Sequence, residues 1–260
     1  MTAIQVSRDW WKDLFDEVYL TTDARSVCNE DITRREVDLI CALVPIRQAD
    51  RILDLCGGHG RHTLALVARG FRRCTLVDYS ACLVNRAKQA AIGGGYEIHC
   101  IRADARHTGL ADRAFDHALI MGNSLGYIDD PAGDRQILGE ARRVLRPGGW
   151  LLVDVTDAEK VAHTLTPRTW HEASDDWVVC RERRLNGRGL AAREMVLSKS
   201  KGIVRDQTYR IRLYDAAGLR ELITDVGFDG VTVHRGFSPH NIPGDYGFMN
   251  TRMVAVGRRP

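Results

Sequence analysis

The sequence predicts an α/β protein built on an open, largely parallel sheet with helices on both faces. Apolar runs that suit buried strands alternate with amphipathic helical segments from residue 51 to residue 155, which is the pattern of a doubly wound sheet. The first run, 51–55, leads directly into a glycine cluster at 57–60 and then a helix. A turn of this kind holds nucleotides at the carboxyl edge of a parallel sheet. Beyond residue 157 the alternation with helices stops, so we expect a separate antiparallel layer there.

The composition limits the number of domains and the kinds of partner. A chain of 260 residues with 44% hydrophobic content can bury one sizeable core, as a single domain or a domain with an insert. Its formal charge of +3 is too small to indicate a nucleic-acid or membrane partner, and no apolar run approaches the roughly 18 residues of a membrane span. Seven cysteines without a C-x-x-C pair are typical of reduced thiols, so we expect a cytoplasmic protein.

Two helices are expected before the first strand. Residues 9–20 suit one amphipathic helix, because Trp11, Phe15 and Val18 share a face at helical spacing. The spacing of Thr33 and Glu36 predicts a capping box for a second helix, which runs to residue 43 before a proline.

The parallel part of the sheet can be assigned run by run. A helix over 61–69 follows the glycine turn and ends at Gly70, a common C-terminal cap. Ser80 caps the next helix, which extends to about residue 91. The strands of this part are expected at 51–55, 73–77, 96–101, 115–121 and 150–155, with a further helix at about 134–145 and a tight turn at 146–149.

The second half of the chain reads mainly as strands. Turn signals at 186–187 and 201–202 separate strand-like runs. These runs are 177–184, 190–198 and 203–214; a helix is expected at 216–226, and strands at 231–235 and 253–256 would close the main sheet as an antiparallel pair.

The glycine turn does not fit the two commonest nucleotide fingerprints. Gly58 and Gly60 supply the first half of G-x-G-x-x-G, but Thr63 stands where the third glycine belongs. No G-K-[ST] follows, so a phosphate-binding loop is excluded as well. The glycines still allow a sharp bend and close backbone approach to a ligand.

Residues 54–62 resemble motif I of the class I S-adenosylmethionine (SAM) methyltransferases. Their sequence is D-L-C-G-G-H-G-R-H, close to the D-L-C-C-G-x-G-R-H variant of that motif, with Cys56 in place of its first glycine. Residues 144–149, V-L-R-P-G-G, are similar to the segment that precedes the fifth strand in this superfamily. The resemblance implies a Rossmann-like sheet of seven strands in the order 3-2-1-4-5-7-6, an antiparallel insert over the active site, SAM as cofactor and S-adenosylhomocysteine (SAH) as product.

Two carboxylates stand at strand ends where this family binds adenosine. Asp78 lies about 20 residues past the turn, which is the spacing of a residue that accepts from both ribose hydroxyls. The resemblance places Asp104 at the adenine amine, although a turn residue is the plainer interpretation. The full set expected to bind the cofactor is Asp54, Cys56, Gly57, Gly58, Gly60, Asp78, Tyr79, Asp104, Ala105, Gly122 and Asn123.

The sequence of the loop after the fourth strand indicates which classes of methyl acceptor are favoured. Residues 122–127, G-N-S-L-G-Y, contain no [DN]-P-P-[YF] turn, which disfavours the methylases of nucleic-acid amines and glutamine amides. G-N-S resembles the glycine N-methyltransferases, in which the asparagine helps to hold the substrate; an ordinary turn residue is the alternative for Asn123. The candidates for acceptor binding and catalysis are Asn123, Tyr127, Arg210, Arg212 and Tyr214.

We expect only one of Arg210 and Arg212, which lie in the same strand-like run, to face the pocket. An arginine there would suit an acidic or zwitterionic acceptor, and a surface ion pair is the alternative. His107, His171 and His240 lie in loops as further base candidates, and no His, Asp and Glu cluster has metal-ligand spacing.

We expect the chain to divide into four segments. Residues 1–45 form N-terminal helices, which the resemblance suggests act as a lid; 46–160 form the SAM-binding core, 161–214 the substrate cap, and 215–260 complete the core. The expected function is methyl transfer to nitrogen or oxygen of a small molecule, such as an amino-acid-like compound or secondary metabolite, with a homodimer left open. The alternatives are an inactive SAM-fold partner subunit and, less favoured, a nucleotide-dependent oxidoreductase.

Overall fold

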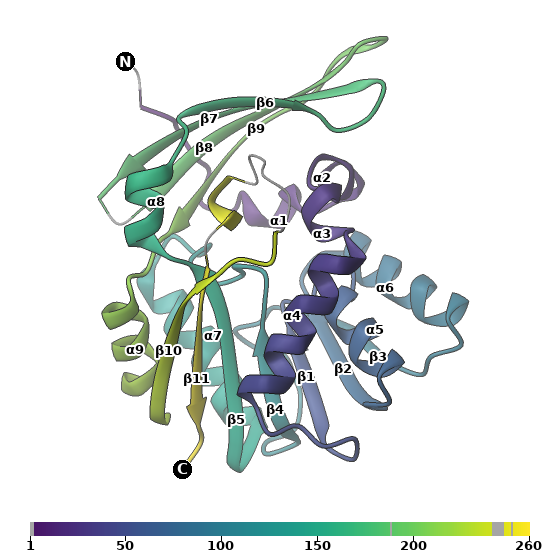
Figure 1. The fold of residues 1–260 in the computed structure, drawn as a ribbon, viewed down its shortest axis with the longest axis vertical. Helices are drawn as coiled ribbons and strands as arrows, with labels where there is room; N and C mark the ends of the chain where they lie inside the picture. The colour runs from purple at the N-terminus through teal and green to yellow at the C-terminus, as the bar shows by residue number, and fades with distance from the viewer. Residues whose placement is uncertain (1–2, 188, 241–246, 251) are drawn as a thin grey trace.

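The computed structural model describes residues 3–187, 189–240, 247–250 and 252–260. Its main sheet has seven strands in the order β10-β11-β5-β4-β1-β2-β3 (Figure 1). With β10 and β11 as the sixth and seventh strands, this is the predicted order, which is thereby confirmed. Neighbours among β1 to β5 pair in parallel, whereas β11 pairs antiparallel with both β5 and β10.

The strands of this sheet are β1 (Arg51–Leu55), β2 (Arg73–Asp78), β3 (His99–Arg102), β4 (Phe115–Ile120), β5 (Leu145–Thr156), β10 (Asp229–Phe237) and β11 (Arg252–Arg258). Every residue of β4 is buried, as expected for a central strand covered on both faces. The expected tight turn at 146–149 lies inside β5, between the pairs Phe115–Leu145 and His117–Trp150, where the pairing is irregular.

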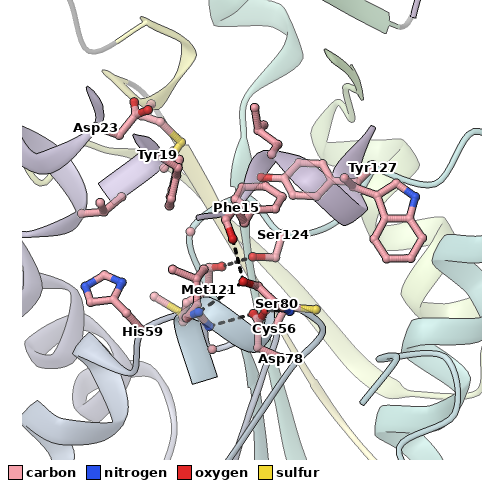
Figure 2. Close-up of a pocket in the computed structure, with 18 of the residues that line it drawn as sticks. Phe15, Tyr19, Asp23, Cys56, His59, Asp78, Ser80, Met121, Ser124 and Tyr127 are labelled. Atoms are coloured by element: carbon pink, nitrogen blue, oxygen red, sulfur yellow. Dashed lines mark hydrogen bonds between the residues drawn. The ribbon is translucent and has the colours of Figure 1, made fainter. Parts of the chain in front are cut away.

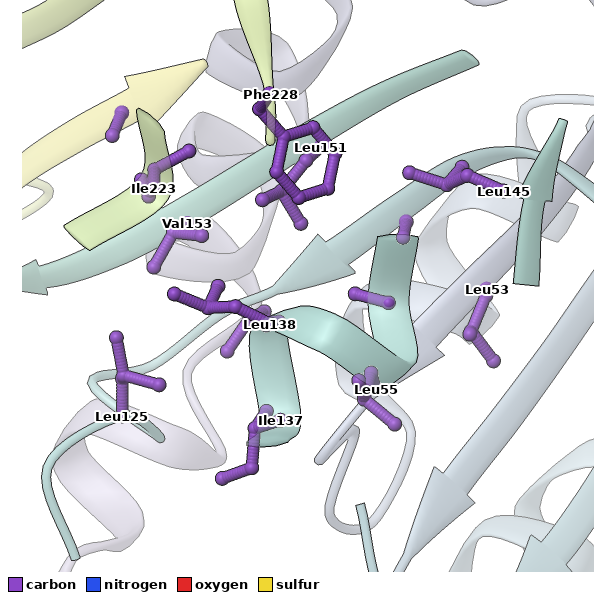
Figure 3. Packing of buried hydrophobic residues seen from close by; sticks show 14 of the residues in the cluster. Leu53, Leu55, Leu125, Ile137, Leu138, Leu145, Leu151, Val153, Ile223 and Phe228 are labelled. Carbon is purple, nitrogen blue, oxygen red and sulfur yellow. The ribbon is translucent and has the colours of Figure 1, made fainter. Parts of the chain in front are cut away.

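Helices cover the sheet on both faces: α4 (Glu30–Leu43), α5 (Arg61–Ala68), α6 (Ala81–Gly93), α7 (Pro131–Val144) and α9 (Ala216–Asp225). Because successive side chains of a strand point to opposite faces, Leu53 packs in one core with α7 and α9, while Ile52 packs in the other with α4 and α5. Figure 3 shows the first core, where Leu138 of α7 and Ile223 of α9 pack beside Leu151 and Val153 of β5.

A second sheet of four antiparallel strands lies above one end of the main sheet (Figure 1). It consists of β6 (Arg168–Glu172), β7 (Trp177–Asn186), β8 (Gly189–Ser198) and β9 (Gly202–Arg212), and a short helix α8 (Ala158–Thr164) precedes it. The sequence predicted three of these strands. It missed β6 because polar residues dominate that strand and its one large apolar side chain, Trp170, is 71% exposed.

The N-terminal segment is broken where one helix was expected. Three short helices occupy it: α1 (Trp11–Leu14), α2 (Glu17–Thr22) and α3 (Ala24–Val27). Asp16 starts a new helix, because its side chain accepts from the backbone N–H of Tyr19 at 3.0 Å. The backbone carbonyl of Phe15 accepts from the Ser80 hydroxyl at 2.6 Å and so ties the break to the main domain.

The predicted capping box at Thr33 and Glu36 is also wrong. Asn29 caps α4 instead, and its side chain accepts from the backbone N–H of Ile32 at 3.0 Å. Glu36 lies in the second turn of α4 and is 1% exposed. Its carboxylate contacts residues that are distant in the sequence.

Among the described residues, no helix has the length and apolar character needed to cross a bilayer.

Candidate active site

A large pocket lies between the carboxyl edge of the main sheet and the inner face of the insert. Its floor comes from the turn after β1, the ends of β2 and β3, and the loop after β4. The N-terminal segment forms one wall, and β7, β8 and β9 contribute the roof. Figure 2 shows Tyr19, Asp23 and Tyr127 on the side of the pocket opposite Cys56 and Asp78.

The turn after β1 bends through three residues in the left-handed region: Cys56 at φ 62°, Gly58 at 57° and Gly60 at 82°. Cys56, Gly57 and Gly58 line the pocket. A Cβ on Gly58 would meet only Leu83, at 3.7 Å, so its pocket side is open. Gly60 and Asp54, both expected to bind the cofactor, are not among the pocket-lining residues. Asp54 is 1% exposed and accepts from the Thr63 hydroxyl at 2.7 Å, so it holds the turn from beneath.

Asp78 at the end of β2 joins the turn to the helix that follows. Its two carboxylate oxygens accept from the backbone N–H of Gly58 and of Ser80, each at 2.8 Å. Burial raises the pKa of this carboxyl to about 6, although both backbone hydrogen bonds act to lower it. Asp78 and the neighbouring Tyr79 both line the pocket.

Beyond β3, Asp104 and Ala105 line the same side of the pocket. Asp104 accepts from the guanidinium of Arg106, with Nε at 2.9 Å, and this contact lowers the pKa of its carboxyl. Trp11 packs edge-on against Tyr79, with ring centroids 4.8 Å apart, and closes this part of the pocket from above.

Of the residues expected at the site from the loop after β4, two line the pocket and Asn123 does not. Gly122 and Tyr127 line the cavity, and Tyr127 stacks on Phe15 with ring centroids 5.6 Å apart. Asn123 does not line it. The Asn123 side chain is 2% exposed and accepts from the backbone N–H of Thr156 at 2.8 Å, so it ties the loop to the end of β5. The expectation that Asn123 faces the acceptor or the cofactor is therefore corrected.

The three expected acceptor residues of the insert region also point elsewhere. Arg210 pairs with Asp129, while Arg212 and the Tyr214 hydroxyl both bind the buried carboxylate of Asp134. Side chains alternate along β9, so Arg210 and Arg212 share one face, while Tyr209 and Ile211 share the face toward the pocket. The expectation that one of the two arginines faces the pocket is therefore wrong. Arg210, Arg212 and Tyr214 thus brace the loop after β4 from outside the cavity.

A buried ionic cluster that the sequence did not reveal lies at one end of the pocket. Glu36 accepts from Arg61, from His62 at 2.9 Å and from Arg252, while Arg252 also donates to Asp154 at 2.7 Å. Burial opposes ionisation of Glu36, but Arg252, Arg61 and the hydrogen bond from His62 hold its pKa well below the usual range. Arg61 and His62 stand in motif I, so their position in the sequence was a usable signal; Glu36 was concealed by its resemblance to a cap.

The roof of the pocket contains a second ionic cluster that the sequence analysis did not predict. Arg181 of β7 donates to Glu194 of β8 at 2.7 Å and to Asp23 of the N-terminal segment at 2.8 Å. Tyr209 lies among them on the inner face, and its pKa is raised to about 12 by burial. Strand alternation could have predicted an inward Arg181 only if the register of the insert on the core had been known.

The histidines proposed as base candidates differ in whether they line the pocket. His107 is exposed, and His171 lies outside the pocket, where its Nε2 donates to the Thr22 carbonyl at 3.2 Å. His240 and the unexpected His59 line the pocket, and the pKa of each is lowered to about 4, chiefly by burial. Over the described ranges, no group of three His, Cys, Asp or Glu is arranged to hold a metal ion.

Comparison with known families finds one matching family model. Residues 52–149 match the model described as a methyltransferase domain. The chain is also similar to the demethylmenaquinone methyltransferase of Mycobacterium sp. (strain KMS), with 32% identity over 134 residues, 52% of each chain. It is 28% identical over 151 residues to the 27-O-demethylrifamycin SV methyltransferase of Amycolatopsis mediterranei, which covers 55% of this chain and 54% of that one. The chain spans about half the length of the curated relatives it matches.

Solved structures extend the likeness in fold to nearly the whole chain. A SAM-dependent methyltransferase from Clostridium acetobutylicum aligns with a TM-score of 0.73 at 15% identity, covering 93% of this chain and 96% of that one. The CcbJ methyltransferase from Streptomyces caelestis aligns with the same TM-score at 21% identity and 99% coverage of both. An amino pentose methyltransferase from Micromonospora echinaspora, solved with SAM bound, has a TM-score of 0.65 at 19% identity, covering 95% and 98%.

Proposed function

We propose that this chain, which contains a methyltransferase domain and has the fold of class I SAM-dependent methyltransferases, transfers the methyl group of SAM to a nitrogen of a small molecule. One observation carries the cofactor assignment. A half-buried carboxylate, Asp78, closes on the glycine turn of β1 at the floor of a pocket that also reaches Asp104 and Gly122. We therefore assign the adenosine of SAM to this carboxyl edge of the parallel sheet.

The cofactor is expected to lie across the strand ends from β3 to β4. Its adenine would occupy the space beside Asp104 and Ala105, under Trp11. Its ribose would then donate both hydroxyls to Asp78, and the sulfonium would lie near Gly122. This arrangement follows the order of the strands, because β3, β2, β1 and β4 are successive neighbours.

The pocket supplies position and desolvation, which are the main requirements of an in-line methyl transfer. A neutral amine can attack the methyl carbon directly, whereas an alcohol needs a base within hydrogen-bond reach. Tyr127, in the loop after β4, cannot act as this base, because burial raises the pKa of its phenol well above the usual value and keeps it protonated. These points favour nitrogen as the acceptor atom.

An oxygen acceptor is the second candidate, and His240 favours it. The imidazole of His240 lines the pocket with its pKa lowered to about 4 by burial, so it is uncharged at neutral pH and can accept a hydrogen bond from an acceptor hydroxyl. One of the similar proteins is named for methylation of an oxygen. Amine and hydroxyl forms of one acceptor, compared in a turnover assay, distinguish the two candidates.

The acceptor is expected under the insert, above Tyr127. Asp23 and the phenols of Tyr19, Tyr127 and Tyr209 line this part of the pocket. One oxygen of Asp23 binds Arg181, and its other oxygen makes no hydrogen bond to the described residues, so it can accept from an acceptor N–H. The insert and the N-terminal segment cover this space (Figure 1), which suits a small molecule better than a polynucleotide.

Asp23→Asn and Tyr127→Phe should reduce turnover and spare the cofactor. Neither side chain lies on the floor where adenosine would bind, so the Kd for SAH should stay within about threefold of wild type. Loss of an acceptor contact should lower kcat/KM at least tenfold, about 1.4 kcal/mol. Arg210→Ala is the matched control, because Arg210 pairs with Asp129 outside the pocket and should retain both constants. Normal turnover in both pocket variants would move the acceptor site elsewhere.

Affinity for SAH should fall as the pH drops through about 6. Ribose hydroxyls donate to ionised Asp78, whose pKa is raised to about 6 by burial, so protonation removes an acceptor. The Kd measured by calorimetry should rise about tenfold between pH 7.5 and pH 5, because the ionised fraction falls tenfold per pH unit below the pKa. In Asp78→Asn the affinity should be lower and nearly independent of pH over this range. An equally steep decline in that variant would assign the titration to another group.

A further inference from the structure

Arg61 stands at the first position of α5, directly after the glycine turn, and its side chain is 12% exposed. One terminal nitrogen, Nη1, donates to Glu36 and to the Thr33 hydroxyl, the latter at 3.2 Å. The other, Nη2, makes no hydrogen bond to the described residues. It lies 3.9 Å from where a Cβ on Gly122 would be. Arg61 therefore presents donors to the gap between the β1 turn and the end of β4.

Arg252, the neighbouring cation, has no such freedom. Its side chain is 0% exposed, and its two terminal nitrogens are committed to Glu36 and Asp154. Of the two arginines bound to Glu36, Arg61 is thus the one with a terminal nitrogen, Nη2, that makes no hydrogen bond to the described residues. Glu36 holds Arg61 from behind and fixes the direction of its guanidinium, as an ion pair with a planar fork can.

The place of Arg61 matches one end of the proposed cofactor. If adenine lies at β3 and ribose at Asp78, the amino-acid end must extend past the turn toward β4, where Arg61 and Gly122 meet. The backbone N–H groups at the start of α5 add partial positive charge at the same place. A carboxylate arriving there meets a charged donor that is already oriented.

We propose that Arg61 binds the α-carboxylate of the methionine moiety of SAM and that Glu36 orients it for this task. The inference rests on the proposed function, since it needs SAM in the pocket. It makes Arg61 a specificity residue: the pocket distinguishes ligands that carry the amino-acid group from adenosine thioethers that lack it. Neither the motif nor any comparison assigns this role to Arg61.

Two ligands isolate the contact. SAH carries the carboxylate, whereas 5′-methylthioadenosine has the same adenosine and sulfur without the amino-acid group. Calorimetry on wild type and Arg61→Ala should show SAH affinity reduced about 10- to 100-fold, the scale of a charge-assisted hydrogen-bond pair. The affinity for 5′-methylthioadenosine should stay within about threefold, which also reports that the variant is folded. Arg69→Ala, on the surface at the end of the same helix, should change neither.

If Arg61→Ala does not fold, Arg61→Lys provides the same test, because it keeps a cation beside Glu36. Its SAH affinity should fall by about 3- to 10-fold with 5′-methylthioadenosine unchanged, since an ammonium cannot form the two-pronged contact. Equal losses for both ligands would show that Arg61 only supports the fold, and unchanged SAH affinity would assign its donors to the acceptor; either result overturns the proposal. Failure of the wild type to bind SAH would instead overturn the proposed function.

Discussion

Replacing Asp78 with alanine is expected to weaken SAH binding by about 3 kcal/mol, a loss of more than 100-fold. The effect should exceed that of a single ligand contact for a structural reason. Asp78 would accept from the ribose, and it also holds the backbone N–H groups of Gly58 and Ser80. Alanine removes all of these acceptors, so the turn that shapes the floor of the pocket loses its anchor as well.

Calorimetric titration of SAH into the variant measures this directly. Asp78→Asn keeps one acceptor oxygen and the side-chain shape, so it should fall between wild type and alanine. Arg135→Ala is a suitable control, because Arg135 pairs with Asp225 at the surface and does not line the pocket. An unchanged Kd for SAH in a folded Asp78→Ala variant would show that Asp78 does not bind the ribose.

Replacing Glu36 with alanine should lower the free energy of unfolding by about 3–5 kcal/mol, the usual cost of leaving a buried charge without its partner. Arg61, His62 and Arg252 all meet on this one carboxylate. Arg252 cannot reach water by a change of rotamer alone, as its side chain is 0% exposed. The cluster joins α4 to the first turn of α5 and to β11, so its loss should be felt across the whole domain.

Urea denaturation of wild type and Glu36→Ala gives the difference. Asp38→Ala is the matched control on the same helix, since its carboxylate is 59% exposed and pairs with Arg69 at the surface; that change should cost about 0–1 kcal/mol. If Glu36→Ala lost less than about 1 kcal/mol, the buried cluster would have to be regarded as a weak contributor to stability.

The main sheet could be predicted because its signals are local. Each parallel strand is an apolar run, and the turn after β1 needs glycine at positions such as Gly60, where φ is positive and a Cβ would approach Ala87 within 3.1 Å. Connections in a doubly wound sheet then leave few topologies. Cys56, Gly57, Gly58, Asp78, Tyr79, Asp104, Ala105 and Gly122, all expected at the cofactor, do line the pocket.

What could not be predicted depends on contacts between distant parts of the chain. A register one residue different would have turned Arg210 inward, yet the sequence of β9 alone fits either face. Glu36 has the spacing of a local cap, but its partners Arg61 and Arg252 come from two other elements. The hydrogen bond from Ser80 to the Phe15 carbonyl helps to break a helix that local periodicity favours.

Asn123 illustrates the limit of a motif. The resemblance to a substrate-binding asparagine depended on three letters, G-N-S, whereas the backbone of Asn123 has φ 63° and its side chain accepts from Thr156. The residue therefore serves the loop as a turn residue, close to the alternative that the sequence had left open.

If the pocket binds SAM and its product, a calorimetric comparison of SAH with NAD will show it. Purified protein should be titrated with SAH and, separately, with NAD under the same conditions. We expect one SAH per chain with a Kd on the order of 1 μM to 1 mM, the usual range for enzyme substrates, and no heat of binding with NAD, because Thr63 interrupts the dinucleotide fingerprint. Saturable binding of NAD without binding of SAH would show that the pocket is not a SAM site and would favour a nucleotide-dependent oxidoreductase.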